Sequence, residues 1–484
     1  MKKLIVIIFI IFGAFLTFSL YRTFAYDTSV VEEVPSTTDL EYTFKIGNSS
    51  IKQITVDSGE TRYYDIVLGN PNNAKISYSV YYEMVSPSTK PDDYKIEYTS
   101  KSTGDSTGIV NNNGNITLNI VVTNTSSNAV TVKLGTVAGY VKGGELLLGS
   151  GQEAIPKRVF PKATYVVEHL DDGTSGDSGR GVYKIEHSAI SADSSATGSE
   201  IPAVTDYRYY GSRPNNYICL DMEGQSTCSD KHLYRIIGSI YEEKENTNRL
   251  KVIKATPLTD GTTNGFSWDY TSSGSHSNIW ATITSGNYSN SLTSGSQLMK
   301  LLNSGAWWNG TSGSYYNNST TATTVNFTNY KLSDKAKSYI STSRYYLGGY
   351  TGPHVLTTAI YEYERGILRY DTNRPLYWDG MIGLMYPSDF GYTAGNSCVA
   401  GTTLYNYLGS RECFQKDWLV SSSTYFLTQY SNSTTEGFYY NSADNWPRYS
   451  VNVMSSVSPT FYLSSDVVIT SGTGSSTDPY LISK

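Results

Sequence analysis

The segment Lys75–Met84, "KISYSVYYEM", carries the clearest β-strand pattern in the first part of the chain. Its larger apolar residues stand at every second position, with Ser77, Ser79, Tyr81 and Glu83 between them. A period of two is typical of a β-strand that buries one face. The segment 116–124, "ITLNIVVTN", alternates in the same way. Ile76, Tyr78, Val80, Tyr82 and Met84 form the first of these apolar faces.

Clusters of turn-forming residues separate such segments throughout residues 41–158, as in "GNPNN" at 69–73 and "NNNGN" at 111–115. About seven short strands in a stretch of this length predict an antiparallel β-sandwich of immunoglobulin type. The region holds neither Cys nor Trp, so it lacks the core disulfide and tryptophan of antibody domains.

The composition supports a mainly β chain of two or three units. Its 484 residues exceed the size of one ordinary domain. The 43 tyrosines and abundant Ser, Thr, Asn and Gly favour strands and turns over long helices. The net charge of −6 argues against a nucleic-acid partner, because proteins that bind nucleic acid carry a basic face.

The N-terminus predicts export. Lys2 and Lys3 precede an uncharged apolar run, Leu4–Leu20, which fits either a cleaved signal peptide or an uncleaved signal anchor. We favour an anchor over residues 1–25, because no small-x-small cleavage site follows the run. Residues 26–40 are polar and form a spacer. A single N-terminal span in the cell membrane would place the bulk of the chain outside the cell, and cleavage would make the protein secreted.

Export makes the cysteines informative. Outside the cell an even number of cysteines implies disulfides, here with three possible connectivities. The pairing between sequence neighbours joins Cys219 to Cys228 and Cys398 to Cys413. A zinc site with four cysteine ligands is the alternative, but it would need two closely spaced pairs.

The rest of the chain divides into a connector, residues 159–205, and an α+β domain, residues 206–484. Residues 294–305 and 332–342 predict helices, the first capped by Ser294 or Ser296 and the second by Ser333. The stretches 232–243, 250–258, 381–386, 458–463 and 466–470 predict strands. Pro387 would turn the chain after the third of these strands, and Asp389 would cap the segment behind the turn.

Candidate functional residues are aromatic rather than catalytic. The five histidines are not spaced as metal ligands on one element, so we expect no metal, no cofactor and no catalytic residue. Aromatic doublets stand in polar loops, among them Tyr315–Tyr316, and such rings suit stacking on sugars or contact with proteins. The candidate ligand-binding residues are Tyr439, Tyr440, Asp444, Trp446, Arg448, Trp307 and Trp308.

The later part of the chain resembles a family of uncharacterised exported proteins from low-GC Gram-positive bacteria. The matching segments include "GVYKIEH" at 181–187, "DYRYYGSRPNNYICL" at 206–220 and "IGLMYPSDFGY" at 382–392. Their layout is similar to the fold of the formylglycine-generating enzyme and of C-type-lectin-like domains. Ser458 stands where proteins of that fold commonly carry Arg. The resemblance implies a scaffold and supplies no activity.

These features predict a membrane-anchored, non-catalytic binding or adhesion protein of the cell surface, with a glycan or a protein as its ligand. The alternatives are a structural component of the envelope and an exported enzyme that acts on cell-wall polymers. The enzyme would need carboxylates that folding brings together.

Overall fold

The computed structural model describes residues 43–46, 53–99, 101–140, 148–170, 181–191, 200–282, 292–349, 354–365, 375–409, 413, 417–420, 422–430, 433–441 and 448–484. The chain divides into two compact units with a boundary between Val159 and Phe160. The predicted anchor, residues 1–25, and spacer, residues 26–40, lie outside the described residues. Among the residues that are described, no helix is long and apolar enough to cross a membrane.

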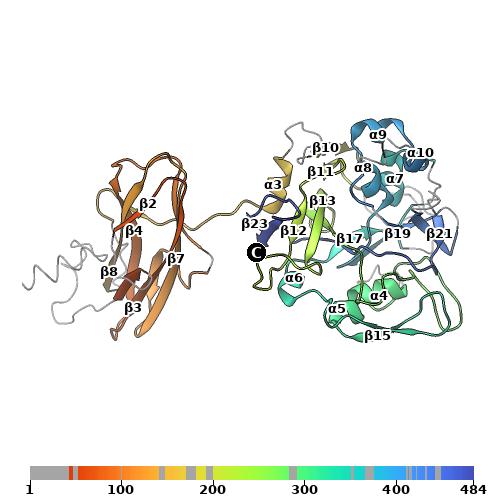
Figure 1. Ribbon diagram of the computed structural model, residues 1–484, viewed down its shortest axis with the longest axis horizontal. Coiled ribbons are helices and arrows are strands. Elements are labelled where there is room, and N and C mark those ends of the chain that lie inside the picture. Colours follow the sequence, from red (N-terminus) through yellow and green to blue (C-terminus); the bar gives the residue numbers. More distant parts are fainter. Residues whose placement is uncertain are drawn as a thin grey trace, which may run out of the picture. The chain divides into compact units, whose positions relative to one another are not determined.

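The first unit consists of two antiparallel sheets (Figure 1). One sheet has the order β1-β3-β7-β5, and the other has the order β2-β8-β4-β6, with β9 also paired to β4. These are the features of an immunoglobulin-like β-sandwich. The strands are β1 (Thr43–Ile46), β2 (Gln53–Val56), β3 (Thr61–Asn70), β4 (Ile76–Ser86), β5 (Tyr94–Tyr98), β6 (Thr107–Val110), β7 (Gly114–Asn124), β8 (Val130–Tyr140) and β9 (Gln152–Ala154).

The apolar residues whose alternation predicted these strands form the core of the sandwich. Ile76, Tyr78, Val80 and Tyr82 of β4 belong to one cluster of buried side chains, together with the alternating residues of β7. Tyr81 points to the other face of its strand and is nevertheless buried. Its ring lies against Gly135 of β8, where a Cβ atom would approach the ring to 2.4 Å. On the second face of β4, Ser79 and Tyr81 are therefore buried, whereas Ser77 and Glu83 are half-buried.

The second unit is built around a mainly antiparallel sheet (Figure 1). Its main path is β10-β11-β13-β12-β24-β23, and β14 extends it by pairing with both β13 and β22. The only parallel pair of named strands described is β12 with β24. The strands are β10 (Val182–His187), β11 (Val204–Tyr209), β12 (Tyr217–Cys219), β13 (Leu233–Glu242), β14 (Thr247–Lys254), β22 (Thr460–Tyr462), β23 (Val468–Ser471) and β24 (Tyr480–Ser483).

Short helices and three small antiparallel sheets complete this unit. The helices are α3 (Ala163–Glu168), α4 (Gln297–Asn303), α5 (Ala306–Asn309), α6 (Asp334–Ser338), α7 (Thr357–Glu364), α8 (Pro387–Tyr392), α9 (Asn396–Gly401) and α10 (Leu404–Gly409). The small sheets pair β15 (Ser312–Tyr315) with β16 (Thr323–Asn326), β17 (Ser343–Tyr346) with β18 (Tyr377–Gly380), and β19 (Thr424–Gln429) with β20 (Glu436–Tyr440) and β21 (Arg448–Ser450).

Two helices begin where the sequence predicts. The hydroxyl of Ser296 accepts a hydrogen bond from the Met299 amide and starts α4. The hydroxyl of Ser333 accepts one from the Ala336 amide and starts α6. Both side chains satisfy a backbone N–H that the helix itself leaves unpaired.

The structure corrects two predictions. Residues 381–386 form no strand; within them, Gly383 makes an isolated β-bridge with Thr460. Pro387 is the first residue of α8, a position that tolerates its missing N–H. Asp389 accepts a hydrogen bond from the Tyr386 amide and does cap this helix. The expected connector, residues 159–205, belongs to the second unit from Phe160 onward, because it supplies α3 and β10.

Both predicted disulfides are present. Cys219 is bonded to Cys228 and Cys398 to Cys413, so sequence neighbours pair. Cys219 ends β12, whereas Cys398 lies in α9. Each bond closes a short loop within the second unit.

Candidate functional site

Most of the aromatic residues that the sequence singled out are buried. Tyr439 and Tyr440 lie in β20 with exposed fractions of 5% and 4%, and Trp307 in α5 is 1% exposed. Trp308 is half-buried against the core. The expectation that the rings of Tyr439, Tyr440 and Trp307 are exposed in loops is wrong, because the strand and the helix turn them into the core, where a ring cannot stack on a ligand.

Two other predicted residues, Asp444 and Trp446, lie outside the described residues. Arg448 is exposed at the start of β21 and forms an ion pair with Glu436, with 3.8 Å between Nη1 and Oε2. Its guanidinium also lies 5.4 Å from the centre of the Tyr430 ring. Of the predicted ligand-binding residues, Arg448 thus remains accessible, but it lines neither of the pockets described below.

A groove of about 590 Å³ crosses the surface formed by α4, α5 and β15. Its volume is within the range of pockets that hold small organic ligands. We call it the α4–β15 groove. Its lining is rich in hydroxyl, amide and aromatic groups and includes Asp269, Tyr270, Thr271, Ser272, Gln297, Lys300, Ser304, Asn309, Thr311, Ser312, Ser314 and Tyr316.

Gln297, the first residue of α4, fixes one aromatic wall of the groove. Its Nε2 donates to the carbonyl oxygen of Tyr316 at 2.6 Å, and its Oε1 accepts from the Tyr316 amide at 3.1 Å. The next residue, Asn317, accepts through Oδ1 from the Ser267 amide at 2.9 Å. These bonds hold the backbone of the turn after β15, where the half-buried Tyr316 lies, to the body of the unit.

Asp269 supplies a carboxylate that is partly withdrawn from water. Its Oδ1 accepts from the Gln297 amide at 3.1 Å, and its Oδ2 accepts from the Ser277 amide at 3.0 Å. Burial raises the pKa of this carboxyl, and the two amides and the nearby Lys300 oppose the rise. The amides orient the carboxylate, while Lys300 brings a positive charge to the same groove.

The second aromatic wall is Tyr270. Its half-buried ring is stacked with His276, with 5.9 Å between ring centres and 19° between planes. The groove therefore combines two tyrosine rings with a carboxylate, an ammonium group, amides and hydroxyls. This chemistry suits a ligand with apolar faces and many hydroxyl groups.

The sequence contained part of this signal. The doublet Tyr315–Tyr316 was among the aromatic residues that the sequence singled out, and the structure buries Tyr315 and places Tyr316 in the groove. Asp269 and Gln297 carried no local signal, because Gln297 bonds to Asp269 and to Tyr316 across 28 and 19 residues of sequence. The helix α5, which contains Trp307 and Trp308, lines the groove through Ala306 and Asn309 instead.

A separate cluster of charges lies inside the second unit. The Arg208 guanidinium contacts Asp206 at 2.9 Å and Asp389 at 2.8 Å, and the Lys251 ammonium contacts Asp389 at 2.5 Å. His187 contacts Asp206 at 3.1 Å. Burial alone would raise the pKa of Asp389, but Lys251 and Arg208 outweigh it and lower the pKa. All these side chains are buried.

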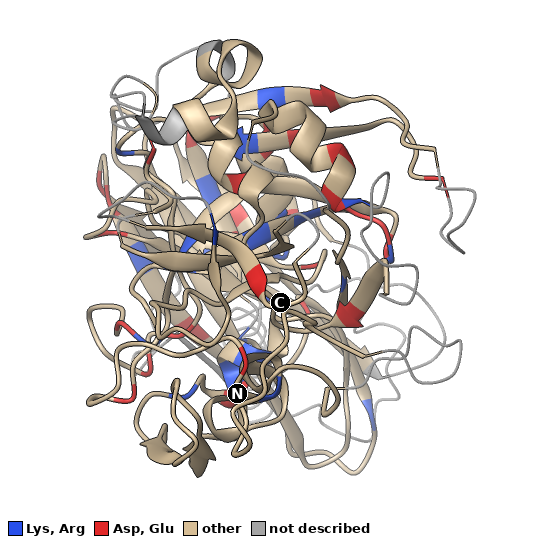
Figure 2. Ribbon diagram, turned by 90° about the vertical axis from the view of Figure 1, so that its right-hand side faces the viewer, with Lys and Arg blue, Asp and Glu red and all other residues tan. Residues whose placement is uncertain are grey.

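This buried cluster has the character of a structural network. Arg208 on β11 and Lys251 on β14 connect the central sheet to Asp389 on α8. The described pockets are not lined by any of them. Figure 2 shows that Lys and Arg are interspersed with Asp and Glu over the described ribbon, rather than gathered by sign. Within the described residues, no group of three or more His, Cys, Asp or Glu side chains is arranged to hold a metal ion.

The fold and the groove define a mainly β, antiparallel protein with an immunoglobulin-like sandwich and a polar, aromatic-lined surface groove. No family model and no curated protein sequence matches the chain. Among solved structures, the chain is similar to the ASH/PapD-like domain 7 of human CEP192, at 15% sequence identity and a TM-score of 0.14. This similarity covers 23% of the chain and 94% of that domain.

Proposed function

We propose that this chain is a non-catalytic binding or adhesion protein of the cell surface, and that the α4–β15 groove binds a glycan. The observation that carries the proposal is the combination of Tyr270 and Tyr316 with Asp269, Gln297 and Lys300 in one groove of about 590 Å³. A pyranose offers an apolar face to a tyrosine ring and hydroxyl groups to carboxylate, amide and ammonium groups.

The surroundings of the groove support a binding role. The side chains of Gln297 and Asp269 are fixed before any ligand arrives, because backbone groups hold them by hydrogen bonds. Preorganised groups lose little conformational entropy on binding. In the proposed arrangement, residues 1–25 anchor the chain in the cell membrane, the sandwich is the stalk, and the second unit is a C-type-lectin-like head outside the cell.

A glycan array probed with the purified protein tests the proposal, followed by titration of each hit. Tyr316→Ala should weaken binding about ten-fold, which corresponds to about 1.4 kcal/mol for one lost ring contact. Tyr330→Ala is the matched control, because that ring is 37% exposed in the same unit and does not line the groove.

Two results would contradict the proposal. The first is a correctly folded protein that binds no glycan on the array. The second is a glycan whose affinity falls equally in the Tyr316→Ala and Tyr330→Ala variants, since binding would then occur outside the groove.

A further inference from the structure

The charges in the α4–β15 groove narrow the choice of ligand. Among the described residues that line the groove, Asp269 and Lys300 are the charged ones, and both side chains are half-buried. They differ in how much of their hydrogen-bonding capacity the protein itself already uses. This difference determines which group of a ligand each of them can accept.

The Asp269 carboxylate already has partners within the protein. The backbone amides of Gln297 and Ser277 each donate to one of its oxygens, at 3.1 and 3.0 Å. The partial positive charges of these two N–H groups face the carboxylate and offset part of its negative charge. Asp269 therefore needs no cationic partner from a ligand.

The Lys300 ammonium is the opposite case. Within the described part of the chain it forms neither an ion pair nor a side-chain hydrogen bond, and it acts on Asp269 only as a nearby charge. An ammonium group has three N–H donors and no acceptor. A ligand that fills the groove displaces water from these donors, and an acceptor of the ligand must replace that water, because an unpaired charge is costly to desolvate.

The helix α4 places this ammonium beside the wall formed by Tyr316. Gln297 and Lys300 both line the groove, and residues three apart in a helix lie on one face with about 5–6 Å between their Cβ atoms. Gln297 bonds to the backbone of Tyr316 at 2.6 and 3.1 Å. The buried side chains of Leu298 and Leu302 anchor the helix in the core. A sugar ring stacked on Tyr316 would therefore have one edge within reach of Lys300.

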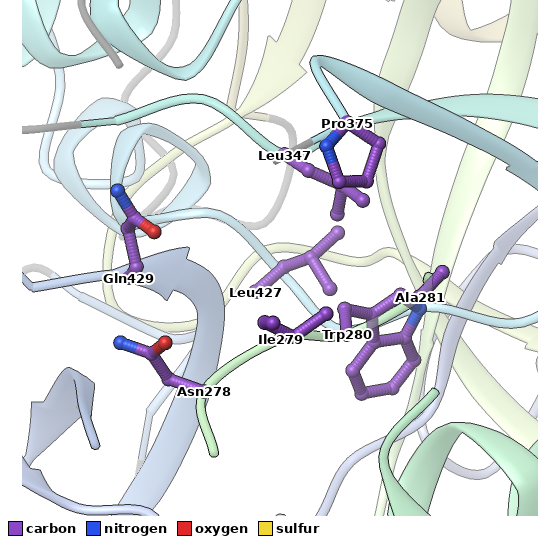
Figure 3. A pocket seen from close by; sticks show the side chains of 8 residues that line it. All are labelled: Asn278, Ile279, Trp280, Ala281, Leu347, Pro375, Leu427 and Gln429. Carbon is purple, nitrogen blue, oxygen red and sulfur yellow. The ribbon is translucent and has the colours of Figure 1, made fainter. Parts of the chain in front are cut away.

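The other described pocket offers no comparable site. It lies between the end of β19 and the segment 278–281, and its lining includes Trp280, Leu427 and Gln429 (Figure 3). Its volume of about 20 Å³ is little more than the about 10–15 Å³ that one water molecule needs. No charged side chain is among the described residues that line it. A sugar fits the groove but not this pocket.

We propose that the glycan in the α4–β15 groove is acidic, and that Lys300 binds the carboxylate of a uronic acid. This inference rests on the proposed glycan-binding function and adds the class of sugar. A carboxylate carries one negative charge, which one ammonium group neutralises, and its oxygens accept from the N–H donors. A phosphate monoester carries about −1.5 to −2 charges and would leave negative charge beside Asp269. Lys300 thus determines specificity, while Tyr316 supplies the stacking surface.

The test compares methyl glucuronide with its methyl ester, which has the same ring without the charge, by NMR titration of the full chain at low salt. The wild-type protein should bind the acid about ten-fold more tightly than the ester. Lys300→Met keeps most of the apolar stem and should weaken the acid alone, whereas Lys300→Arg should keep the preference. Lys244→Met is the matched control, because Lys244 is exposed, carries the same charge and does not line the groove.

Salt dependence gives an independent readout. Raising the ionic strength from about 0.01 M to about 0.1 M should weaken the acid and leave the ester unchanged, because it screens the charge of Lys300. Equal affinities of acid and ester in the wild type, or a preference that survives Lys300→Met, would overturn the proposal. Tighter binding of glucose 6-phosphate than of methyl glucuronide would overturn the assignment of a carboxylate. If Lys300→Met loses the ester as well, the preference in the wild type and in Lys300→Arg decides the question.

The proposed function and this inference fail in different ways. Tyr316→Ala should weaken the acid and the ester alike, because both sugars stack on the same ring. Acid and ester that bind equally, and are both weakened by Tyr316→Ala, would remove the charge assignment and leave the proposed function. Absence of binding by the acid, the ester and every glycan of the array would remove both.

Discussion

Replacement of the buried acid Glu364 by glutamine should stabilise the protein at neutral pH. Glu364 ends α7 and is fully buried. Its Oε1 accepts from the Ser388 amide at 2.9 Å, and its Oε2 accepts from the Ser388 hydroxyl. The Arg365 guanidinium lies 3.5 Å from Oε2. Burial raises the pKa of Glu364 from 4.5 to about 7, and Arg365 and Ser388 only partly oppose this rise.

The direction of the effect follows from proton binding. Between pH 4.5 and about 7 the unfolded chain has released the Glu364 proton, whereas the folded chain still holds it. The stability contributed by this group is therefore largest below pH 4.5 and is lost as the pH rises toward 7. At about 1.4 kcal/mol per pKa unit, the loss is about 3 kcal/mol. A glutamine at this position would resemble the protonated acid at every pH and would avoid this loss.

Urea unfolding followed by tryptophan fluorescence measures the effect, because all seven tryptophans lie in the second unit. Glu364→Gln should match the wild type near pH 4.5 and exceed its free energy of unfolding at pH 8 by about 2–3 kcal/mol. Burial also raises the pKa of Asp417 to about 7, so its titration changes the stability of the wild type and of the variant in the same way. The difference between their free energies of unfolding therefore reports on Glu364 alone. A variant that is less stable than the wild type at pH 8 would refute the reasoning, since it would show an ionised carboxylate paired with Arg365.

Three further outcomes are expected. Asp389→Asn should lower the free energy of unfolding, measured by chemical denaturation, by about 3–5 kcal/mol, because it leaves the buried Lys251 without its counter-ion. The double variant Asp389→Asn with Lys251→Met should recover part of that loss. Reduction of the two disulfides should lower the stability of the second unit by about 2–3 kcal/mol per short loop in calorimetry, with the sandwich transition unchanged. Trp307→Ala should cost about 3–5 kcal/mol of unfolding free energy, and the half-buried Trp308→Ala clearly less; equal losses would contradict their different burial.

The elements with strong local signals could be predicted from the sequence. The period of two in 75–84 indicated β4, and a serine followed by a helical pattern indicated α4 and α6. The short helices α7, α8 and α9 begin after Leu356, Tyr386 and Gly395, so they lack the serine N-cap that marks α4 and α6 in the sequence. In α8, Pro387 looked like the end of a strand, although proline is equally suited to the first turn of a helix.

The candidate site depends on contacts that no local pattern reveals. The buried pair Arg208 and Asp389 is 181 residues apart in sequence, and the groove forms only when Gln297 bonds to Tyr316. Aromatic doublets were a weak guide because a tyrosine-rich chain also builds its core from rings. Tyr439 illustrates this, since it packs against Tyr425 at 4.9 Å between ring centres instead of facing solvent.

The parallel pairing of β12 with β24 sets an order of events during biosynthesis. Ile218 of β12 pairs with Tyr480 of β24, and β14 pairs with β22. The central sheet can therefore be completed only after these C-terminal strands have been synthesised. All strands of the sandwich lie before residue 155. A growing chain therefore carries a completed sandwich while the second unit still has open strand edges, which are prone to aggregation. A chain truncated before β24 would keep the edge of β12 unpaired and would remain prone to aggregation.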